Sequence, residues 1–540
     1  MTAVHDFPEK SGSASNRTAR VLADRAAGEA YVASVCFKHG PPRLTGVELE
    51  FTVHHADDPA RPLDPDVLAT ALGPHTPRTL RPDSPASPLP AGSPVSLEPG
   101  GQVEISALPQ ASLPELDAAV TADLTTLRDR LARHGLELGA TGIDAHRPPR
   151  RILHTPRYAA MERRFAAIGP GGLTMMCSTA GLQICVDAGE PAEYAARWAA
   201  AHAMGPPLLA LFANSRVHAG RDTGHASARW LAVHETEAVR TRTTGFGFGG
   251  PGGSNGSDGT TGFGGTGDSG RTGDGLNGFG GSGDPGGPHR FGGIGGSDRN
   301  SGSGEARGTH GAAGSRRTGA PGGLNGSGGT GHGLNGSGDP GEPNRFGGSV
   351  DSGKTGNSGN PAPSQPPLSD PAAAWGARLM DTPLMVLRRG DRPWDAPEGL
   401  TFADWIEGRG AGALLPRPTV ADLDYHLTTM FTPVRPQGYL EIRYLDAQPP
   451  GDWLVPVALV AALLARPSTV DKVRELCAPV ADAWATAAQC GLADRELAAA
   501  AAALADLGCA ELGETGLAAD RITEISESVQ GRAHRAGSER

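Results

Sequence analysis

Four short segments of the chain alternate between apolar and polar residues, a pattern typical of β-strands. In residues 46–53, aliphatic or aromatic side chains alternate with Glu48, Glu50 and a threonine. Because successive side chains of a strand point to opposite faces, the two carboxylates project from the same face, roughly 7 Å apart. The pattern predicts a strand with one apolar and one acidic side.

Three further segments, residues 98–106, 182–187 and 440–444, show the same alternation and again carry their polar side chains on one face. Those side chains are Gln102, Glu104 and Ser106 after a leading Glu98, then Gln183 and Asp187, then Glu441 and Arg443. Such alternation is also typical of an ordinary antiparallel sheet with one solvated face, and the pattern alone leaves that alternative open.

Longer segments follow the helical period. Leucine and valine recur every three or four residues from Leu116 to Leu131, which predicts an amphipathic helix of roughly four turns. Residues 193–204 predict a second helix that stops at Gly205, which two prolines follow. Most of residues 454–508 is rich in Ala and Leu, which predicts further helices. The chain is therefore expected to be of the α+β class, with a helical C-terminal part.

Composition divides the chain. Many of the 79 glycines lie in one block, where the sequence around Leu276 returns in similar form around Leu334. Such a segment buries too little apolar surface to offset the entropy of ordering its backbone. We expect a disordered tail at 1–20, a first part of the catalytic domain at 21–243, a disordered insertion at 244–367 and the second part at 368–535.

Two catalytic patterns occur inside this block, GSVDSGKT at 348–355 and GGSNG at 252–256. The first fits the spacing of a phosphate-binding loop, and the second fits that of a nucleophilic serine turn. A phosphate-binding loop needs a buried strand before it and a helix after it, and the flanking glycine-rich sequence predicts neither. We interpret both as chance matches.

Charge and cysteine usage restrict the partners. A net charge of −11 and a pI of about 5.9 argue against nucleic acid or an anionic membrane, since both require clustered Lys and Arg. The N-terminus lacks an apolar signal region, and the apolar stretch at 454–464 is too short to cross a bilayer. None of the six cysteines forms a CxxC pair. We expect a cytoplasmic protein with free thiols that acts on small molecules.

The acidic face suggests metal chemistry. The polar sides of the four strands carry no lysine, and carboxylates gathered without one repel each other unless a cation lies between them. Oxygen-only ligands favour Mg²⁺ or Mn²⁺, while Arg443 is suited to a phosphate or carboxylate. This set fits ATP-dependent amide formation, in which the acid is activated as an acyl phosphate.

Five segments together resemble the glutamate–cysteine ligase family, and most closely its actinobacterial branch, which makes γ-glutamylcysteine for ergothioneine synthesis. These segments are GVELEF, EPGGQVEIS, TMMCSTAGLQICVD, ALFANS and HLTTMFTPVRPQGYLEIRYLDAQP. The likeness runs in order through residues 40–243 and resumes near Pro371. It implies a glutamine-synthetase-like fold, with a curved, mainly antiparallel sheet, helices behind it and the active site in the concave face.

The resemblance also implies residue roles and a reaction that passes through γ-glutamyl phosphate, with ATP as co-substrate. It implies Mg²⁺ (or Mn²⁺) ligands at Glu48, Glu50, Glu98, Glu104 and Glu441, and contacts to anionic groups from Arg443 and Arg435. Substrate or nucleotide contacts would come from Gln102, Gln183, Asn214, Ser227 and Arg229, although the last three fit helix-end or loop roles equally well.

The chain departs from the family pattern ahead of Arg240. The family usually has a tryptophan and an Asp-Pro pair where this chain has Val233, Glu237 and Ala238. Glutamate keeps the charge of aspartate but has a longer reach, so this segment either tolerates change or alters substrate binding. Two rival functions remain: a carboxylate–amine ligase with another acceptor, because one pocket side chain changes acceptor choice by only a few kcal/mol, and a non-catalytic regulator that keeps the fold.

Overall fold

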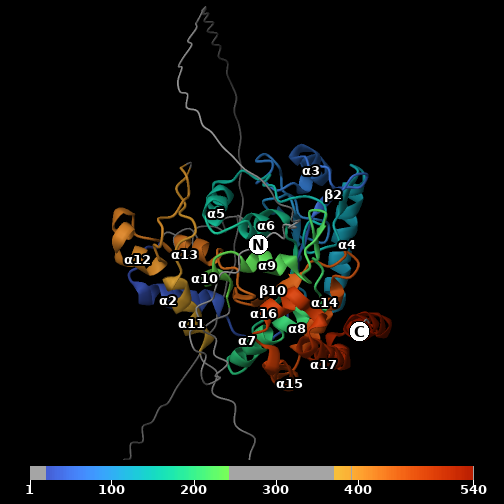
Figure 1. Ribbon diagram of the computed structural model, residues 1–540. Coiled ribbons are helices and arrows are strands. Elements are labelled where there is room, and N and C mark those ends of the chain that lie inside the picture. Colours follow the sequence, from blue (N-terminus) through green and yellow to red (C-terminus); the bar gives the residue numbers. More distant parts are fainter. Residues whose placement is uncertain (1–19, 243–369, 391, 539–540) are drawn as a thin grey trace, which may run out of the picture. The chain divides into compact units, whose positions relative to one another are not determined.

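The computed structural model describes residues 20–242, 370–390 and 392–538 (Figure 1). The described residues on both sides of the Gly-rich block belong to one compact unit. The expected tail as far as residue 19, the expected insertion at 244–367 and the two motifs inside it lie outside the described residues.

A six-stranded antiparallel sheet forms the centre of this unit, in the order β3-β4-β1-β6-β10-β9. Its strands are β1 (Thr45–Phe51), β3 (Val95–Leu97), β4 (Val103–Ser106), β6 (Gly181–Val186), β9 (Val434–Pro436) and β10 (Leu440–Asp446). Two small two-stranded sheets pair β2 (Val53–His55) with β5 (Leu136–Leu138) and β7 (Val217–His218) with β8 (Arg221–Asp222). The predicted antiparallel α+β character is confirmed.

The acidic segment at 98–106 is not a single strand, as the alternation predicted. Residues 98–102 instead form the turn between β3 and β4, and the Glu98 carbonyl accepts a hydrogen bond from the Gly101 amide at 2.9 Å. Pro99 has no amide hydrogen for a sheet ladder, and Gly101 has φ +90°, a conformation that glycine adopts without strain. Glu98 therefore lies at the tip of a hairpin.

Seventeen α-helices occur in the described part of the chain. They are α2 (Arg25–Cys36), α3 (Pro65–Leu72), α4 (Leu113–Ala132), α5 (Pro156–Ala166), α6 (Gly171–Ser178), α7 (Tyr194–Ala203), α8 (Gly205–Leu211), α9 (Ala228–His234), α10 (Ala238–Thr241), α11 (Pro371–Asp381), α12 (Phe402–Glu407), α13 (Val420–Leu427), α14 (Leu454–Leu463), α15 (Pro467–Cys477), α16 (Trp484–Cys490), α17 (Arg495–Glu511) and α18 (Ala519–Ser538). The helices predicted at 116–131 and 193–204 correspond to α4 and α7. The residues expected only to stop α7 also begin α8, because proline is well tolerated in the first turn of a helix.

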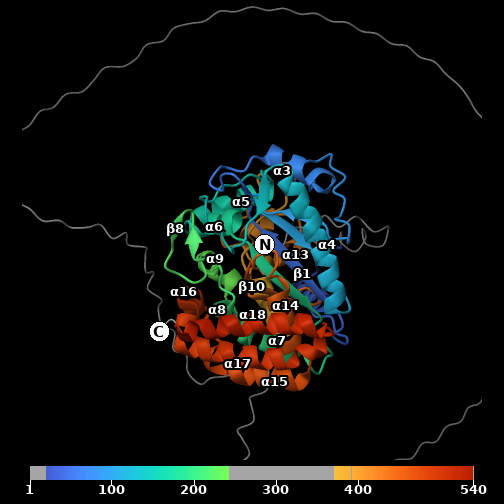
Figure 2. The same cartoon turned by 90° about the vertical axis from the view of Figure 1, so that its right-hand side faces the viewer.

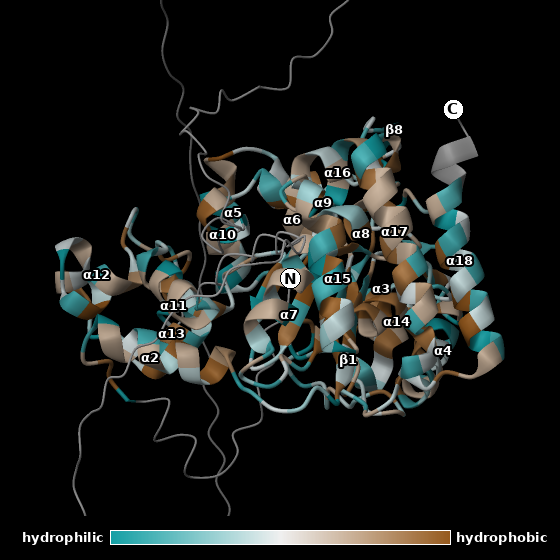
Figure 3. Ribbon diagram, turned by 90° about the horizontal axis from the view of Figure 1, so that it is seen from below, coloured by the Kyte–Doolittle hydropathy of each residue, from teal (hydrophilic) through white to brown (hydrophobic). Residues whose placement is uncertain are grey.

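The C-terminal helices pack beside the sheet. α14 has its side chains buried almost all round, and α17 packs against α8, α14 and α18. Figure 2 shows α15, α17 and α18 side by side, and Figure 3 shows that α18 is largely hydrophilic where α14 is hydrophobic. Within the described ranges, no one helix has the length and apolarity to cross a membrane; α14 and residues 467–480 meet that test only together, bent by 105°.

Both parts of the chain contribute to the central sheet. β10, which follows the Gly-rich block, pairs with β6, which precedes it, so that β6 separates β10 from β1. α11 likewise packs against α2. A site on the polar face of this sheet that includes both β1 and β10 therefore combines residues more than 300 positions apart in the sequence.

Candidate active site

The acidic face of the sheet is buried. The exposed fractions of Glu48, Glu50, Glu98, Glu104 and Glu441 lie between 0% and 7%. An ordinary solvated sheet face would leave such side chains in water. The alternative of a wet face is therefore excluded, and the buried carboxylates need partners or protons.

Three of these carboxylates converge. Glu50 and Glu104 are directly opposite each other on β1 and β4, and Glu98 approaches them from the β3–β4 turn. One oxygen from each lies within 4.8 Å of the others. Both oxygens of Glu98 and Oε2 of Glu104 are buried and have no hydrogen-bond partner among the described residues.

The chemistry of this triad fits a hard divalent cation. Mg²⁺ binds oxygen ligands at about 2.0–2.1 Å, so that oxygens on opposite sides of the ion are roughly 4 Å apart. Ser96 donates to Oε1 of Glu104 at 2.9 Å, which leaves Oε2 available. The pKa values of Glu98 and Glu104 are raised to about 8, mainly by burial, and neighbouring carboxylates contribute in the same direction. A cation would relieve this unfavourable grouping.

Glu48 lies next to the triad. It is opposite Gln183 on β6 and Ser106 on β4, and its Oε2 has no hydrogen-bond partner in the described structure. Burial, followed by the charges of Glu104 and Glu441, raises its pKa well above the usual value. Glu48 is therefore a further acid that a cation on this face would stabilise.

Glu441 has a different environment from the other four acids. Its Oε2 accepts a hydrogen bond from Nε of Arg435 at 2.6 Å, and its Oε1 accepts from Arg435 and Arg443 at 2.9 Å each. Burial would raise the pKa of Glu441, but the two guanidinium groups outweigh it and lower the pKa to about 2. The structure thus groups three of the five predicted metal ligands, with Glu48 beside them and Glu441 held between two arginines.

A chain of hydrogen bonds joins the arginines to the carboxylate triad. Arg443 donates to the amide oxygen of Gln183, and the Gln183 amide nitrogen donates to Oε1 of Glu50 at 2.8 Å. Oε2 of Glu50 accepts from the backbone of Gly181 at 2.7 Å. A register shift in β10 between Ile442 and Leu445 accompanies this arrangement. The two arginines and the carboxylate triad are therefore adjacent and joined by hydrogen bonds.

Gln102 fixes the turn that carries Glu98. Its amide nitrogen donates to the carbonyls of Thr179 and Met176 at 2.9 and 3.3 Å, and its oxygen accepts from the Gly100 amide at 3.0 Å. These contacts tie the β3–β4 hairpin to α6 and the residue that follows it. They give Gln102 a local structural function, whereas its contact with a substrate stays a prediction.

Asn214, Ser227 and Arg229 gather around Asp446, a fully buried carboxylate that the sequence did not single out. Asp446 accepts hydrogen bonds from the backbone amide of Asn214 at 2.8 Å and from the hydroxyls of Ser215 and Ser227 at 2.7 and 2.9 Å. Ser227 is also the N-cap of α9. Arg229 donates to the Arg443 carbonyl at 3.0 Å, so this cluster supports the strand that carries Arg443.

A cavity of about 1030 Å³ opens beside the acidic face. Its walls include Glu48, Ser106, Arg157, Tyr158, Trp394 and Tyr439. Arg157 is 8% exposed, and its guanidinium lies 5.0 Å from the ring centre of Tyr425, which also lines the cavity. Sequence reasoning missed Arg157, although a signal existed: it recurs with Met161 and Phe165 on the buried face of α5.

His426, Cys177 and Cys185 behave as structural residues. The Nε2 atom of His426 lies 3.1 Å from the Leu379 carbonyl, and burial lowers the pKa of His426 to about 3. Burial raises the pKa of the Cys177 thiol to about 12 and that of Cys185 well above its usual value. All six cysteines are free. A thiol with a raised pKa is a poor nucleophile at neutral pH.

These features define the class of the molecule: an α+β protein whose central sheet has a buried face lined by acids and arginines, at the edge of a cavity. The profile of glutamate–cysteine ligase family 2 matches residues 44–249 and 355–536, and the chain belongs to this family. Membership identifies it as a ligase and implies the use of ATP.

Relatives from two mycobacterial species match most of the chain. It is 30% identical over 504 residues to glutamate–cysteine ligase EgtA of Mycolicibacterium smegmatis, an alignment that covers 93% of this chain and 85% of that protein. The identity to EgtA of Mycobacterium tuberculosis is 31% over 486 residues, 89% of this chain and 82% of that protein. A chloroplastic glutamate–cysteine ligase of Arabidopsis thaliana is 32% identical over 158 residues, 28% of this chain and 30% of that protein.

Proposed function

We propose that this protein joins the γ-carboxylate of L-glutamate to the amine of L-cysteine at the expense of ATP, through γ-glutamyl phosphate. The observation that carries the proposal is the triad of Glu50, Glu98 and Glu104, which is coupled through Gln183 to Arg443. Glu98 and Glu104 contribute buried oxygens that have no hydrogen-bond partner among the described residues. Ligase family membership and the two EgtA relatives support the same reaction. The product would enter ergothioneine biosynthesis, the role implied for this branch.

In this proposal the triad holds Mg²⁺, or Mn²⁺, with Glu48 beside it. The bound ion would neutralise charge that gathers on the phosphoryl group during transfer. Arg443 and Arg435 contact the phosphate or the substrate carboxylate, and Glu441 keeps both guanidinium groups oriented. The burial of this face limits access of water, which protects an acyl phosphate from hydrolysis.

The resemblance extends this proposal to the type of sheet and the location of the substrates. The sheet would be of the glutamine-synthetase type, and the substrates would occupy the cavity beside it. A volume of about 1030 Å³ is enough for ATP together with small amino acids. The raised thiol pKa values of Cys177 and Cys185 agree with a reaction in which the thiol comes from the substrate. We place the reaction in the cytoplasm.

The test is incubation of the purified protein with ATP, Mg²⁺, glutamate and cysteine, followed by mass detection of γ-glutamylcysteine. A parallel assay of ADP release with glutamate and a panel of amines distinguishes cysteine from other acceptors. Turnover only with another amine would replace cysteine as the acceptor. No turnover with any amine, from protein that still binds ATP, would favour a non-catalytic regulator.

A further inference from the structure

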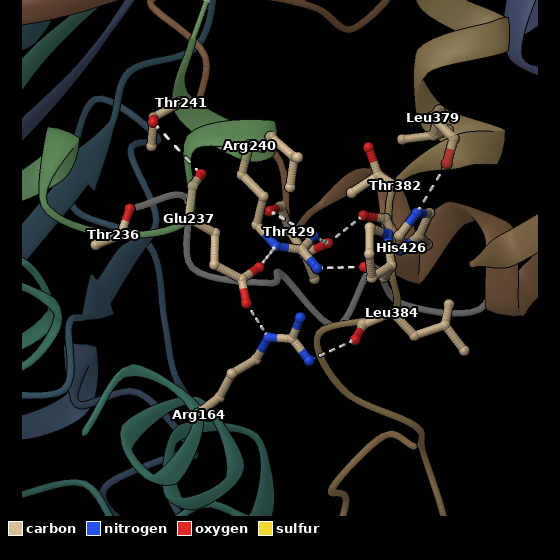
Figure 4. A network of polar contacts seen from close by, with 12 residues as sticks. Arg164, Thr236, Glu237, Arg240, Thr241, Leu379, Thr382, Leu384, His426 and Thr429 are labelled. Carbon is tan, nitrogen blue, oxygen red and sulfur yellow. Dashed lines mark hydrogen bonds and ion pairs between the residues drawn. The ribbon is translucent and has the colours of Figure 1, made fainter. Parts of the chain in front are cut away.

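A single carboxylate bridges two arginines at the edge of the described first part of the chain. Oε2 of Glu237 accepts a hydrogen bond from Nε of Arg240 at 2.5 Å, and Oε1 accepts from Nε of Arg164 on α5 (Figure 4). The side chain of Glu237 is 11% exposed, and that of Arg240 is fully buried. Glu237 is the position where the family usually has aspartate.

Both arginines also donate hydrogen bonds to residues in the second part of the chain. Nη1 of Arg240 donates to the Thr429 hydroxyl at 2.9 Å, and Nη1 of Arg164 donates to the Leu384 carbonyl at 3.1 Å. The backbone carbonyl of Arg240 also accepts from the Phe431 amide at 3.0 Å. Glu237 therefore organises a buried contact between segments on either side of the Gly-rich block.

The segment that contains Thr429 also contacts Arg157, a cationic side chain of α5 in the cavity wall. Thr428, which precedes Thr429, accepts two hydrogen bonds from Arg157, at 2.9 Å to its hydroxyl and 3.2 Å to its carbonyl. Arg157 lies in the cavity wall and is close enough to Glu98 to lower the pKa of that carboxyl, against the larger effect of burial. A displacement of Thr428 would move this guanidinium.

We propose that Glu237 and Arg240 form a positioning pair, which fixes Arg157 through Thr428 and Thr429 for an anionic group of a substrate. The group is a phosphate of ATP or a carboxylate of glutamate, since a guanidinium recognises both in the same way. This inference rests on the proposed function. It also accounts for the departure from aspartate: at an unchanged backbone, a side chain shorter by one methylene does not reach both arginines.

The chain offers a matched control. Arg163, the neighbour of Arg164 on α5, also pairs with a residue of the second part, Asp395, through two hydrogen bonds of 2.7 and 2.6 Å. That pair is about half exposed, at 53% and 46%. Exposed ion pairs contribute little, so Arg163→Gln should leave all kinetic constants unchanged.

The experiment measures kcat and separate KM values for ATP and glutamate in Glu237→Gln, Glu237→Asp, Thr428→Val and Arg163→Gln. We expect Glu237→Gln and Thr428→Val to raise one KM by about tenfold or more, with kcat changed less than about threefold. Glu237→Asp should resemble Glu237→Gln. An increase confined to ATP identifies a phosphate, and one confined to glutamate identifies a carboxylate.

Three outcomes overturn the inference. The first is an unchanged KM for both substrates in folded Glu237→Gln. The second is the same result in folded Thr428→Val, which replaces the hydroxyl by a methyl group and is the deciding variant if the Glu237 variants fail to fold. The third is an equal change in Arg163→Gln. If the wild-type protein makes no γ-glutamylcysteine, the proposed function fails by itself. Calorimetric titration of the same variants with glutamate, or with a non-hydrolysable ATP analogue and Mg²⁺, then still tests the positioning of Arg157.

Discussion

Glu50 and Glu104 are direct partners across the β1–β4 pair, so two buried carboxylates lie side by side with a third, Glu98, within reach. Neighbouring strands place opposite side chains only about 5 Å apart, which makes this pair repulsive when both are ionised. A folded protein keeps such an arrangement where a cation or a proton occupies it. Ligase activity and the pH dependence of stability distinguish a bound cation from a bound proton.

Replacing Glu104 by Gln should nearly abolish ligase activity, because the amide keeps the shape of the side chain but removes the charge that a cation needs. We expect a loss of at least about 100-fold in kcat/KM. This loss is larger than that expected from removing a residue that only hydrogen-bonds to a metal ligand. Ser96→Ala is the matched control, since Ser96 only orients Glu104 through a hydrogen bond of 2.9 Å. A Glu104→Gln enzyme with normal turnover would mean that the triad is not a metal site.

Without a bound cation, the stability of the protein should decrease as pH rises, and Mg²⁺ should oppose this decrease. The pKa values of Glu98 and Glu104, about 8, exceed those of unfolded carboxyls, so the metal-free folded state binds more protons between about pH 4.5 and 8. Its free energy of unfolding should therefore decrease as pH rises through this window. Mg²⁺ competes with these protons, so it should raise the Tm more at pH 8 than at pH 6.

Thermal unfolding at the two pH values, with EDTA or Mg²⁺, checks this expectation. Glu98→Gln removes one of the titrating groups and should weaken both the pH dependence and the effect of Mg²⁺ relative to wild type. Glu441 does not contribute between pH 6 and pH 8, because its folded pKa of about 2 leaves it ionised there, as it is in the unfolded chain. Equal stabilisation by Mg²⁺ at pH 6 and pH 8 would contradict a site built from these carboxylates.

Arg443→Lys should reduce kcat more than it raises the KM for glutamate. The guanidinium of Arg443 contacts Gln183 and Glu441 together, and a lysine ammonium does not reproduce this planar arrangement. We expect kcat to fall on the order of 100-fold, as when one preorganised donor is removed from an active site. Steady-state kinetics test this expectation, with Arg216→Lys as a control because Arg216 is exposed. A change in KM alone would place Arg443 in substrate binding only.

Local alternation was enough to predict most of the sheet and its acidic face, because the orientation of side chains in a strand depends only on the two-residue repeat. The place of Glu98 in a turn was missed, since Pro99 and Gly101 interrupt a segment that otherwise alternates. The start of α8 at Gly205 was missed for a similar reason: the residues that end one helix also fit the first turn of the next.

Contacts between distant segments could not be predicted from local patterns. The hydrogen bond from Arg443 to Gln183 joins β10 to β6 across 260 positions, and the cluster around Asp446 draws on Ser215 and Ser227, more than 200 positions away. The bridge from Glu237 to Arg164 likewise spans 73 positions. Family resemblance supplied several of these residues as a set, but only the fold shows which of them contact one another.

Shortening the Gly-rich block should leave the enzyme active. The family profile matches residues on both sides of 250–354, and α11 contacts α10 directly, since Nη2 of Arg378 donates to the Val239 carbonyl at 3.0 Å. A linker of about ten Gly and Ser residues, whose ends average roughly 17 Å apart, should therefore replace residues 250–360. Loop length affects stability only weakly, so we expect kcat/KM within roughly threefold of wild type and a similar Tm. Lys354→Ala in the full-length chain tests the phosphate-loop pattern separately and should have no effect. A folded but inactive shortened protein, or an inactive Lys354→Ala variant, would show that this block supplies part of the active site.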